Sequence, residues 1–435
     1  MNFLTKLLPY KSNTNTLLDA IRPLGHLVAL ESASPNHESG RWSIISAGPV
    51  KTLTNTTFNS DATVAIESLI KLLPKTSSEL PFIGGLIGHA SYGFVEGDIE
   101  KSRSEKHNVE SSKITASLYT WAYLLDHKDK KAYLVYWTEI SQVDIETLVD
   151  YYHLEHKQIQ GFKMLRKFSA SWSHKQYEEK FNKIQDYIKS GDTYQINLTQ
   201  KFNGNYTGSP LSAYCSLKAQ SHSPFLAYYE SDDFTLASAS PELFIQCKGN
   251  KITTKPIKGT IPRAVDAELD NANIVKLKES KKDMAENLMI TDLLRNDLSI
   301  ICQNTTTPKL FEIESFETVH HLVSTITAEK PSGATAFSVF KSCFPGGSIT
   351  GAPKKRAMEI INELEDFSRD LYCGSSFYYS VNENFNSNIL IRSFVFKDGE
   401  VNCWAGGGVT IDSKWESEYQ ESLDKISRLM QVLEK

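Results

Sequence analysis

The strand-like segments of this sequence follow one another in groups, and amphipathic helical patterns separate the groups. The apolar runs at residues 225–230, 235–238 and 243–247, for example, are divided only by short polar intervals. Such short intervals suit antiparallel neighbours, because parallel strands need a long crossover connection. The order therefore predicts an α+β fold and excludes a regular parallel sheet built from βαβ units.

The periodicity of apolar residues defines the remaining elements. Predicted helices cover residues 15–22, 60–73, 173–191, 280–296, 353–365 and 414–434. Predicted strands also cover residues 27–30, 42–47, 82–88, 115–126, 131–137, 194–202, 389–396 and 401–409. The interval 139–172 is more polar and less periodic, so we place a boundary there. It divides an N-terminal part, residues 1–165, from a C-terminal part, residues 166–435.

Composition narrows the range of partners. The 435 residues are 40% hydrophobic, with 47 Lys and Arg against 52 Asp and Glu, a balance that gives no reason to expect nucleic acid or an anionic membrane as a partner. No apolar run is long enough to span a membrane, and the N-terminus does not resemble a signal peptide. The six cysteines lack the spacing of a metal or redox motif. We expect a cytoplasmic protein.

A proline- and glycine-framed segment, Lys255–Arg263, holds a single lysine, Lys258, at its centre. Two prolines and a glycine restrict most of the backbone around this lysine, and the pattern predicts a loop. Taken alone, the segment fits a loop with a solvated lysine.

Two pairs of carboxylates lie on distant predicted helices. Asp283 and Glu286 form one pair and Glu418 and Glu421 the other, each with the i,i+3 spacing that places both groups on one helix face. Asp283 also fits a helix capping box, and the second pair fits a solvated acidic face. Alternatively, the pairs meet around one Mg²⁺, which needs only one or two direct carboxylates besides water and substrate oxygens.

Several other residues fit the binding of an anion. The glycine-rich segment Phe344–Arg356 leads into a helix and directs backbone N–H groups outward. Arg392 lies in an otherwise apolar predicted strand, where a substrate carboxylate or a structural ion pair would satisfy it. Trp404–Val409 is a glycine-rich strand that permits close approach. His321 is either a buried core histidine or a hydrogen-bonding group of the site.

Together these segments resemble the chorismate-utilising enzymes, among them the large subunits of anthranilate synthase and aminodeoxychorismate synthase, and the isochorismate and salicylate synthases. The resemblance covers nearly the whole chain. It rests on Leu30–Ser32, Gly191–Leu198, Ser240–Phe244, Lys255–Arg263, Asp292–Leu298, His320–Ser324, Phe344–Arg356 and the last predicted helix. It implies two orthogonally packed antiparallel sheets with helices outside and an active site in the C-terminal part.

The resemblance also implies roles for individual residues. Glu286 and Glu421 would bind Mg²⁺ directly, Asp283 and Glu418 would hold its waters, and the metal would hold the ring carboxylate of chorismate. The other implied substrate contacts come from Arg392, Tyr378, Thr260, Gly406, Gly407, Gly408, Lys425 and Gln195. Glu242 would be the general acid at the C4 hydroxyl, and His321 would orient the ring carboxylate. Phe377 replaces a glycine that is usual before the family's tyrosine, which leaves the role of Tyr378 open.

The motif Pro-Ile-Lys-Gly-Thr is similar to that of aminodeoxychorismate synthases, whereas anthranilate synthases have alanine at the position of Lys258. It implies that Lys258 attacks C2 of chorismate before ammonia adds at C4. The reaction needs an uncharged amine, which Mg²⁺, Lys255 and Arg263 are candidates to favour. Without a glutaminase cysteine, we expect ammonia from a separate glutamine amidotransferase subunit.

Two alternatives remain from the sequence. The first is an anthranilate synthase component I, because Lys258 is a single marker. The second is a non-catalytic regulatory protein that binds tryptophan or chorismate. Glu31 and Ser32 match a motif that helps form a tryptophan pocket in relatives, and this pocket would be either a feedback site or a vestigial one.

Overall fold

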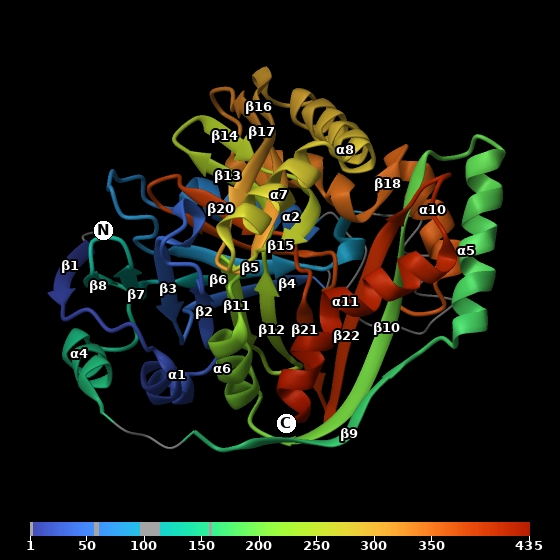
Figure 1. The fold of residues 1–435 in the computed structure, drawn as a ribbon. Coiled ribbons are helices and arrows are strands. Elements are labelled where there is room, and N and C mark those ends of the chain that lie inside the picture. Colours follow the sequence, from blue (N-terminus) through green and yellow to red (C-terminus); the bar gives the residue numbers. More distant parts are fainter. Residues whose placement is uncertain (1–2, 56–60, 96–113, 156–158) are drawn as a thin grey trace.

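The computed structural model describes residues 3–55, 61–95, 114–155 and 159–435, which form two large antiparallel sheets (Figure 1). The first sheet runs in the order β1 (Phe3–Leu8), β8 (Lys131–Trp137), β7 (Trp121–Asp126), β3 (Trp42–Ser46), β2 (Val28–Glu31), β11 (Phe225–Glu230), β12 (Thr235–Ser240), β21 (Ser393–Lys397), β22 (Glu400–Val409), β10 (Gln195–Gly208) and β18 (Gly351–Ala352). Strand β9 (Phe162–Ala170) also pairs with β10.

The second sheet runs in the order β15 (Ile257–Pro262), β17 (Val319–Glu329), β14 (Lys251–Thr254), β13 (Leu243–Lys248), β20 (Phe385–Asn388), β19 (Ser375–Ser380), β5 (Gly85–Ala90), β6 (Ile114–Tyr119) and β4 (Lys51–Asn55). Strand β16 (Gln303–Ser315) pairs with β17. The predicted α+β class with two antiparallel sheets is therefore confirmed. Both sheets contain strands from either side of residue 165, and the proposed division there stays a prediction.

Helices cover the outer faces, and apolar side chains fill the space between the layers. One core lies between the two sheets and extends under α2 (Asp61–Leu72), α8 (Lys281–Ser299) and α9 (Ala336–Cys343). A second core lies beneath α1 (Asn15–Ile21), α4 (Ile145–His153), α6 (Pro210–Gln220) and α11 (Trp415–Glu434). A third joins α5 (His174–Lys189) and α10 (Lys354–Leu364) to β10. Helix α7 (Ala267–Lys278) packs beside β15, and α11 crosses beside β22 (Figure 1).

The loop predicted around Lys258 is wrong in one respect, because Ile257–Pro262 is strand β15 at the end of the second sheet. Pro256 precedes it and Pro262 is its last residue, and an edge position tolerates the missing proline donors. The pairing with β17 shifts register between Ile257 and Thr260, where Gly259 has a φ of 80°. The strand therefore has a bulge at the lysine.

Other boundaries also differ from the prediction. The run 115–126 is two strands, β6 and β7, which belong to different sheets and are separated by the single buried residue Thr120. Arg392 lies just before β21 with a φ of 55°, and not inside a strand. Both errors arise because the segments are mostly buried on both faces, so the sequence pattern marks no break. The predicted helix 60–73 is observed from Asp61, and residue 60 lies outside the described residues.

A buried ion pair fixes the centre of the molecule. Arg369 and Glu365 are both fully buried, and their charged atoms approach to 2.6 Å. Arg369 also donates to the carbonyl oxygens of Ile349 and Asn197, and Glu365 accepts from Thr199 N. The pair thereby ties the glycine-rich segment to β10. No helix within the described ranges is long and apolar enough to cross a membrane.

A pH-dependent stability follows from His89, which lies on β5 between the rings of Tyr229 and Phe234 and leaves both ring nitrogens without a hydrogen-bond partner in the described residues. Burial lowers the pKa of His89 from 6.5 to about 4. The unfolded chain therefore binds this proton at a higher pH than the folded chain does, and stability is lost as the pH falls from about 6.5 towards 4.

The variant His89→Phe should lack this contribution to the pH dependence of the unfolding free energy. Between pH 7 and pH 5, wild-type protein should lose about 2 kcal/mol more unfolding free energy than the variant does, measured by urea denaturation at both values. The same change at exposed His153 should leave the pH difference as in wild type. An equal loss in wild type and His89→Phe would contradict the prediction.

Candidate active site

Strand β15 holds Lys258 at the edge of the second sheet, facing helix α8. The bulge at Gly259 turns the lysine toward the helix, and Thr260 pairs with His321 across to β17. A Cβ at Gly259 would lie 2.9 Å from Cγ of Asp283, so glycine is needed both for its positive φ and for the close approach of the helix. The side chain of Lys258 is only 14% exposed, and its Nζ lies 3.9 Å from Oε2 of Glu286.

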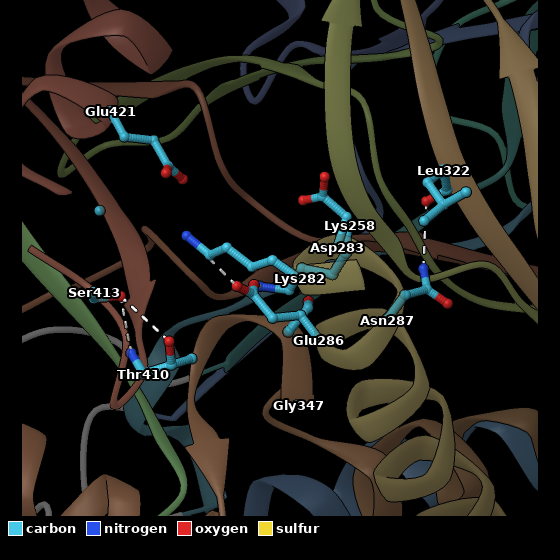
Figure 2. Close-up of polar contacts among 12 residues, drawn as sticks. Lys258, Lys282, Asp283, Glu286, Asn287, Leu322, Gly347, Thr410, Ser413 and Glu421 are labelled. Atoms are coloured by element: carbon cyan, nitrogen blue, oxygen red, sulfur yellow. Dashed lines mark hydrogen bonds and ion pairs between the residues drawn. The ribbon is translucent and has the colours of Figure 1, made fainter. Parts of the chain in front are cut away.

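Asn287 fixes the first turns of α8 to the sheet. Its Nδ2 donates to the carbonyl oxygen of Leu322 at 3.3 Å (Figure 2), and its Oδ1 accepts from Ser324 Oγ. Because Asn287 is fully buried, the neighbouring Glu286 is held at the sheet surface. Ser280 caps the helix by accepting from Asp283 N at 3.3 Å, so the capping contact expected at Asp283 is present, and its role at a metal stays a prediction.

Helix α11 brings the second carboxylate pair to the same region. Glu418 Oε1 accepts from Ser413 Oγ at 2.7 Å. Glu421 lies 2.7 Å from Lys425, whose Nζ also donates to the carbonyl oxygen of Gly406 at 2.9 Å. Lys282, on α8, lies 3.9 Å from Glu286 and 3.8 Å from Glu418. Figure 2 shows Lys282 and Glu286 extending from α8 toward the side of Glu421.

Burial and neighbouring charges act against each other on these carboxylates. Burial raises the pKa of Glu286, and the positive charges of Lys258 and Lys282 only partly oppose it. Burial likewise raises the pKa of Glu418. At Glu421 burial would raise the pKa, but Lys425 outweighs it and the pKa is lowered. The region is therefore a partly desolvated acidic cluster that favours an additional cation.

The acidic cluster fits Mg²⁺ in its donor chemistry. Oε2 of Glu418 is buried and has no hydrogen-bond partner in the described residues. A Cβ at Gly407 would lie 2.8 Å from this oxygen and 3.3 Å from Oε1 of Glu421, so a glycine keeps the space open. Within the described ranges no three His, Cys, Asp or Glu side chains gather closely enough to hold a metal by themselves. Mg²⁺ needs fewer direct protein ligands than that, because water and substrate complete its shell.

Glu242 lies between β12 and β13, and the charges of Lys258 and Lys425 act on it. It is buried, and its Oε1 accepts from Ser348 Oγ of the glycine-rich segment at 2.8 Å. Burial raises its pKa, while the charges of Lys258, Lys425 and Arg392 act in the opposite direction. These three cations come from β15, α11 and the segment before β21, so the fold brings distant parts of the chain to one acid.

His321 and Arg392 are two further polar residues near Glu242 and Lys258. Nδ1 of His321 lies 2.8 Å from Oγ1 of Thr260, and burial with the nearby charge of Arg392 lowers the pKa of this histidine to about 3. His321 is therefore neutral near pH 7. The guanidinium of Arg392 forms no side-chain hydrogen bond or ion pair with the described residues, and burial lowers its pKa. A desolvated arginine of this kind favours an anionic partner.

Gln195, Gly406 and Gly408 line the glycine-rich strand. A Cβ at Gly408 would lie 2.2 Å from Nε2 of Gln195, and the buried Oε1 of Gln195 has no hydrogen-bond partner in the described part of the chain. A Cβ at Gly406 would lie 2.3 Å from the carbonyl oxygen of Leu198. Close backbone packing thus explains the glycine at 406 and the side chain of Gln195 explains the glycine at 408, whereas the glycine at 407 faces the carboxylates.

Tyr378 and Glu31 border a different space, a cavity of about 1050 Å³ between the sheets. The ring of Tyr378 packs edge-on against Phe82, and no described contact joins it to Arg392. Glu31 is buried and accepts hydrogen bonds from Thr14, Tyr214 and Lys218, so its pKa is lowered despite its burial. Ser32 accepts from Ser34 N at 2.9 Å.

Sequence reasoning missed three contributors. Lys282 and Ser348 contact site residues, and Asn287 anchors α8 to β17. None of the three stands in a recognisable spacing, and only the packing of α8 and the glycine-rich segment reveals them. Lys255 and Arg263, which the sequence suggested as cations beside Lys258, form ion pairs with other residues. Lys255 lies 2.9 Å from Glu314, and Arg263 lies 2.8 Å from Asp270. These ion pairs make both residues poor candidates for favouring an uncharged Lys258.

Comparison with known proteins gives concordant matches. A family model described as chorismate binding enzyme matches residues 27–431. Aminodeoxychorismate synthase component 1 of Escherichia coli (strain K12) is 37% identical over 436 residues, covering 95% of each chain. Anthranilate synthase component 1 of Lactococcus lactis subsp. lactis (strain IL1403) is 32% identical over 434 residues, covering 93% of this chain and 94% of the relative. The crystal structure of anthranilate synthase component I from Streptococcus pneumoniae TIGR4 matches with a TM-score of 0.77 and 27% identity, covering 90% of this chain and 92% of that chain.

The space next to Gly407 can be tested directly. Gly407→Ala should weaken Mg²⁺ binding by about tenfold or more, because the added methyl group displaces the carboxylates of Glu418 and Glu421; isothermal titration calorimetry measures the change. Gly161→Ala, whose Cβ would meet nothing within 4 Å, should bind Mg²⁺ as wild type does. Unchanged Mg²⁺ affinity in Gly407→Ala would show that these carboxylates do not hold the ion.

Proposed function

The chain belongs to the chorismate-binding enzyme family, and on this premise we propose that it is an aminodeoxychorismate synthase component 1, which converts chorismate and ammonia to 4-amino-4-deoxychorismate. The relatives with this name support the proposal by their identity over nearly the whole chain. Such a product serves 4-aminobenzoate and folate synthesis.

One observation favours this activity over others of the family: the buried amine of Lys258 lies beside the acidic cluster and its charge also acts on Glu242. A lysine in that position stands between the proposed metal ligands and the proposed acid. A solvated loop lysine, the alternative from the sequence, would be neither desolvated nor close to these groups.

The chain's own residues would bind chorismate through its two carboxylates. Arg392, which has a desolvated guanidinium without an ion-pair partner in the described residues, would bind the enolpyruvyl carboxylate. Neutral His321, oriented by Thr260, would donate a hydrogen bond to the ring carboxylate. Amides of the glycine-rich strands, Lys425 and Gln195 would complete the contacts. We keep Tyr378 as a proposed contact to the enolpyruvyl carboxylate, although its packing against Phe82 does not support it.

The proposed reaction proceeds in two displacements. Nζ of uncharged Lys258 would form a bond to C2, both ring double bonds would shift along C1, C6 and C5 toward C4, and the C4 hydroxyl would leave as water with the proton of Glu242. Ammonia would then bond to C4, both double bonds would shift back, the C2–Nζ bond would break to release the lysine amine, and the new ammonium at C4 would return a proton to Glu242. The raised pKa of Glu242 suits a general acid, because more of it is protonated near neutral pH than of an ordinary carboxyl.

We propose that Glu286 and Glu421 hold Mg²⁺ directly and that Asp283 and Glu418 hold its waters. The ion would supply positive charge for the ring carboxylate. Glu286 also faces Lys258, with 3.9 Å between its Oε2 and the lysine Nζ. An ion held by Glu286 would therefore lie close to the proposed nucleophile.

Ammonia would come from a separate glutamine amidotransferase subunit. The name component 1 of the relatives implies a second component. We further propose that the protein acts in the cytoplasm, consistent with its six free cysteines. The Glu31 pocket remains a proposed tryptophan site, in which the ion pair of Glu31 with Lys218 would have to be kept or replaced.

The assay that tests this function supplies chorismate, Mg²⁺ and ammonium to the purified chain and identifies products by mass spectrometry. We expect aminodeoxychorismate. With glutamine as the only nitrogen source, turnover should require an added amidotransferase subunit. Formation of anthranilate would support the anthranilate synthase alternative, and no turnover with ammonium would support a non-catalytic protein.

The nucleophile is tested by Lys258→Ala and Lys258→Arg. Both should lower aminodeoxychorismate formation on the order of 1000-fold or more, because alanine removes the amine and arginine keeps the charge without an available lone pair. Any residual product of Lys258→Ala should be anthranilate. Normal aminodeoxychorismate output from either variant would exclude a covalent role for Lys258.

A further inference from the structure

Lys282 is the residue that joins the two acidic helices. It belongs to α8, but its Nζ lies 3.8 Å from Oε1 of Glu418 on α11 as well as 3.9 Å from Oε1 of Glu286 on its own helix. The charges of Glu418, Glu286, Glu421 and Asp283 all act on it and raise its pKa against the effect of burial. The preceding residue, Lys281, is exposed and forms no ion pair with the described residues.

The ammonium of Lys282 and a cation bound by the acidic cluster need the same oxygens. Glu286 is a proposed direct ligand of Mg²⁺, and Glu418 is a proposed holder of its water. We propose that Lys282 is an internal counter-cation of the acidic cluster, which stabilises it before metal binding and is displaced when Mg²⁺ binds. This inference rests on the proposed function, whose metal site it concerns.

Two features of the structure support displacement. The side chain of Lys282 is 56% exposed, so its ammonium can be rehydrated when it leaves the carboxylates. The carboxylate of Glu418 is 3% exposed, and its second oxygen has no hydrogen-bond partner in the described residues. The buried, unpartnered oxygen of Glu418 therefore leaves room for further positive charge, while the ammonium of Lys282 limits repulsion between Glu286 and Glu418.

Lys282→Met tests the proposal, with Lys281→Met as the matched control. Both variants remove one positive charge from the same helix turn, but only the first removes contacts with Glu286 and Glu418. In EDTA, the melting temperature of Lys282→Met should fall by about 1 to 3 °C relative to Lys281→Met. In calorimetric titration with Mg²⁺ alone, Lys282→Met should bind about fivefold more tightly than Lys281→Met, because the ion no longer displaces an ammonium.

Lys282→Arg should restore the behaviour of wild type, since the guanidinium keeps the charge. Equal melting temperatures and equal Mg²⁺ affinities of the two methionine variants would overturn the proposal. Weaker Mg²⁺ binding by Lys282→Met would also overturn it, because that result means that Lys282 assists the ion. The product assay on wild type separates these outcomes from a failure of the proposed function, which would instead show no aminodeoxychorismate.

Discussion

Repulsion between like charges is the constraint that the site has to satisfy. Helices α8 and α11 each present two carboxylates to one region, and burial makes every one of these charges harder to solvate. The fold holds the helices together by contacts outside the acidic cluster. Asn287 binds α8 to β17 through buried hydrogen bonds, and the apolar face of α11 packs on the first sheet. The stability of these contacts permits an arrangement that the carboxylates alone would oppose.

A second set of buried contacts fixes the glycine-rich segment, which contacts Glu242. Arg369 and Glu365 connect the glycine-rich segment to β10, and that segment supplies Ser348 to Glu242. Breaking one partner of a fully buried pair leaves an unpaired charge in the interior, which typically destabilises a protein by several kcal/mol. The position of Glu242 therefore depends on a pair that does not itself touch the site.

The sequence identifies the paired carboxylates more readily than it locates their neighbours. The spacing of Asp283 with Glu286 and of Glu418 with Glu421 identifies two helical faces, because helical periodicity is a local property. Short gaps likewise indicate antiparallel sheets. Where a segment is buried on all sides, as at residues 115–126 and around Arg392, apolar pattern marks no boundary. The ion pairs of Lys255 and Arg263, and the bridging position of Lys282, depend on tertiary packing and have no local signature.

The charges around Lys258 relate the position of this lysine to the proposed reaction. Oε2 of Glu286 lies 3.9 Å from Nζ of Lys258, and the proposed reaction needs an uncharged amine at this position. In that proposal, a cation bound by Glu286 would compete with Lys258 for the carboxylate and would also hold the substrate. Lys282 would then neutralise part of the acidic cluster from a position that is 56% exposed, where Mg²⁺ could displace it.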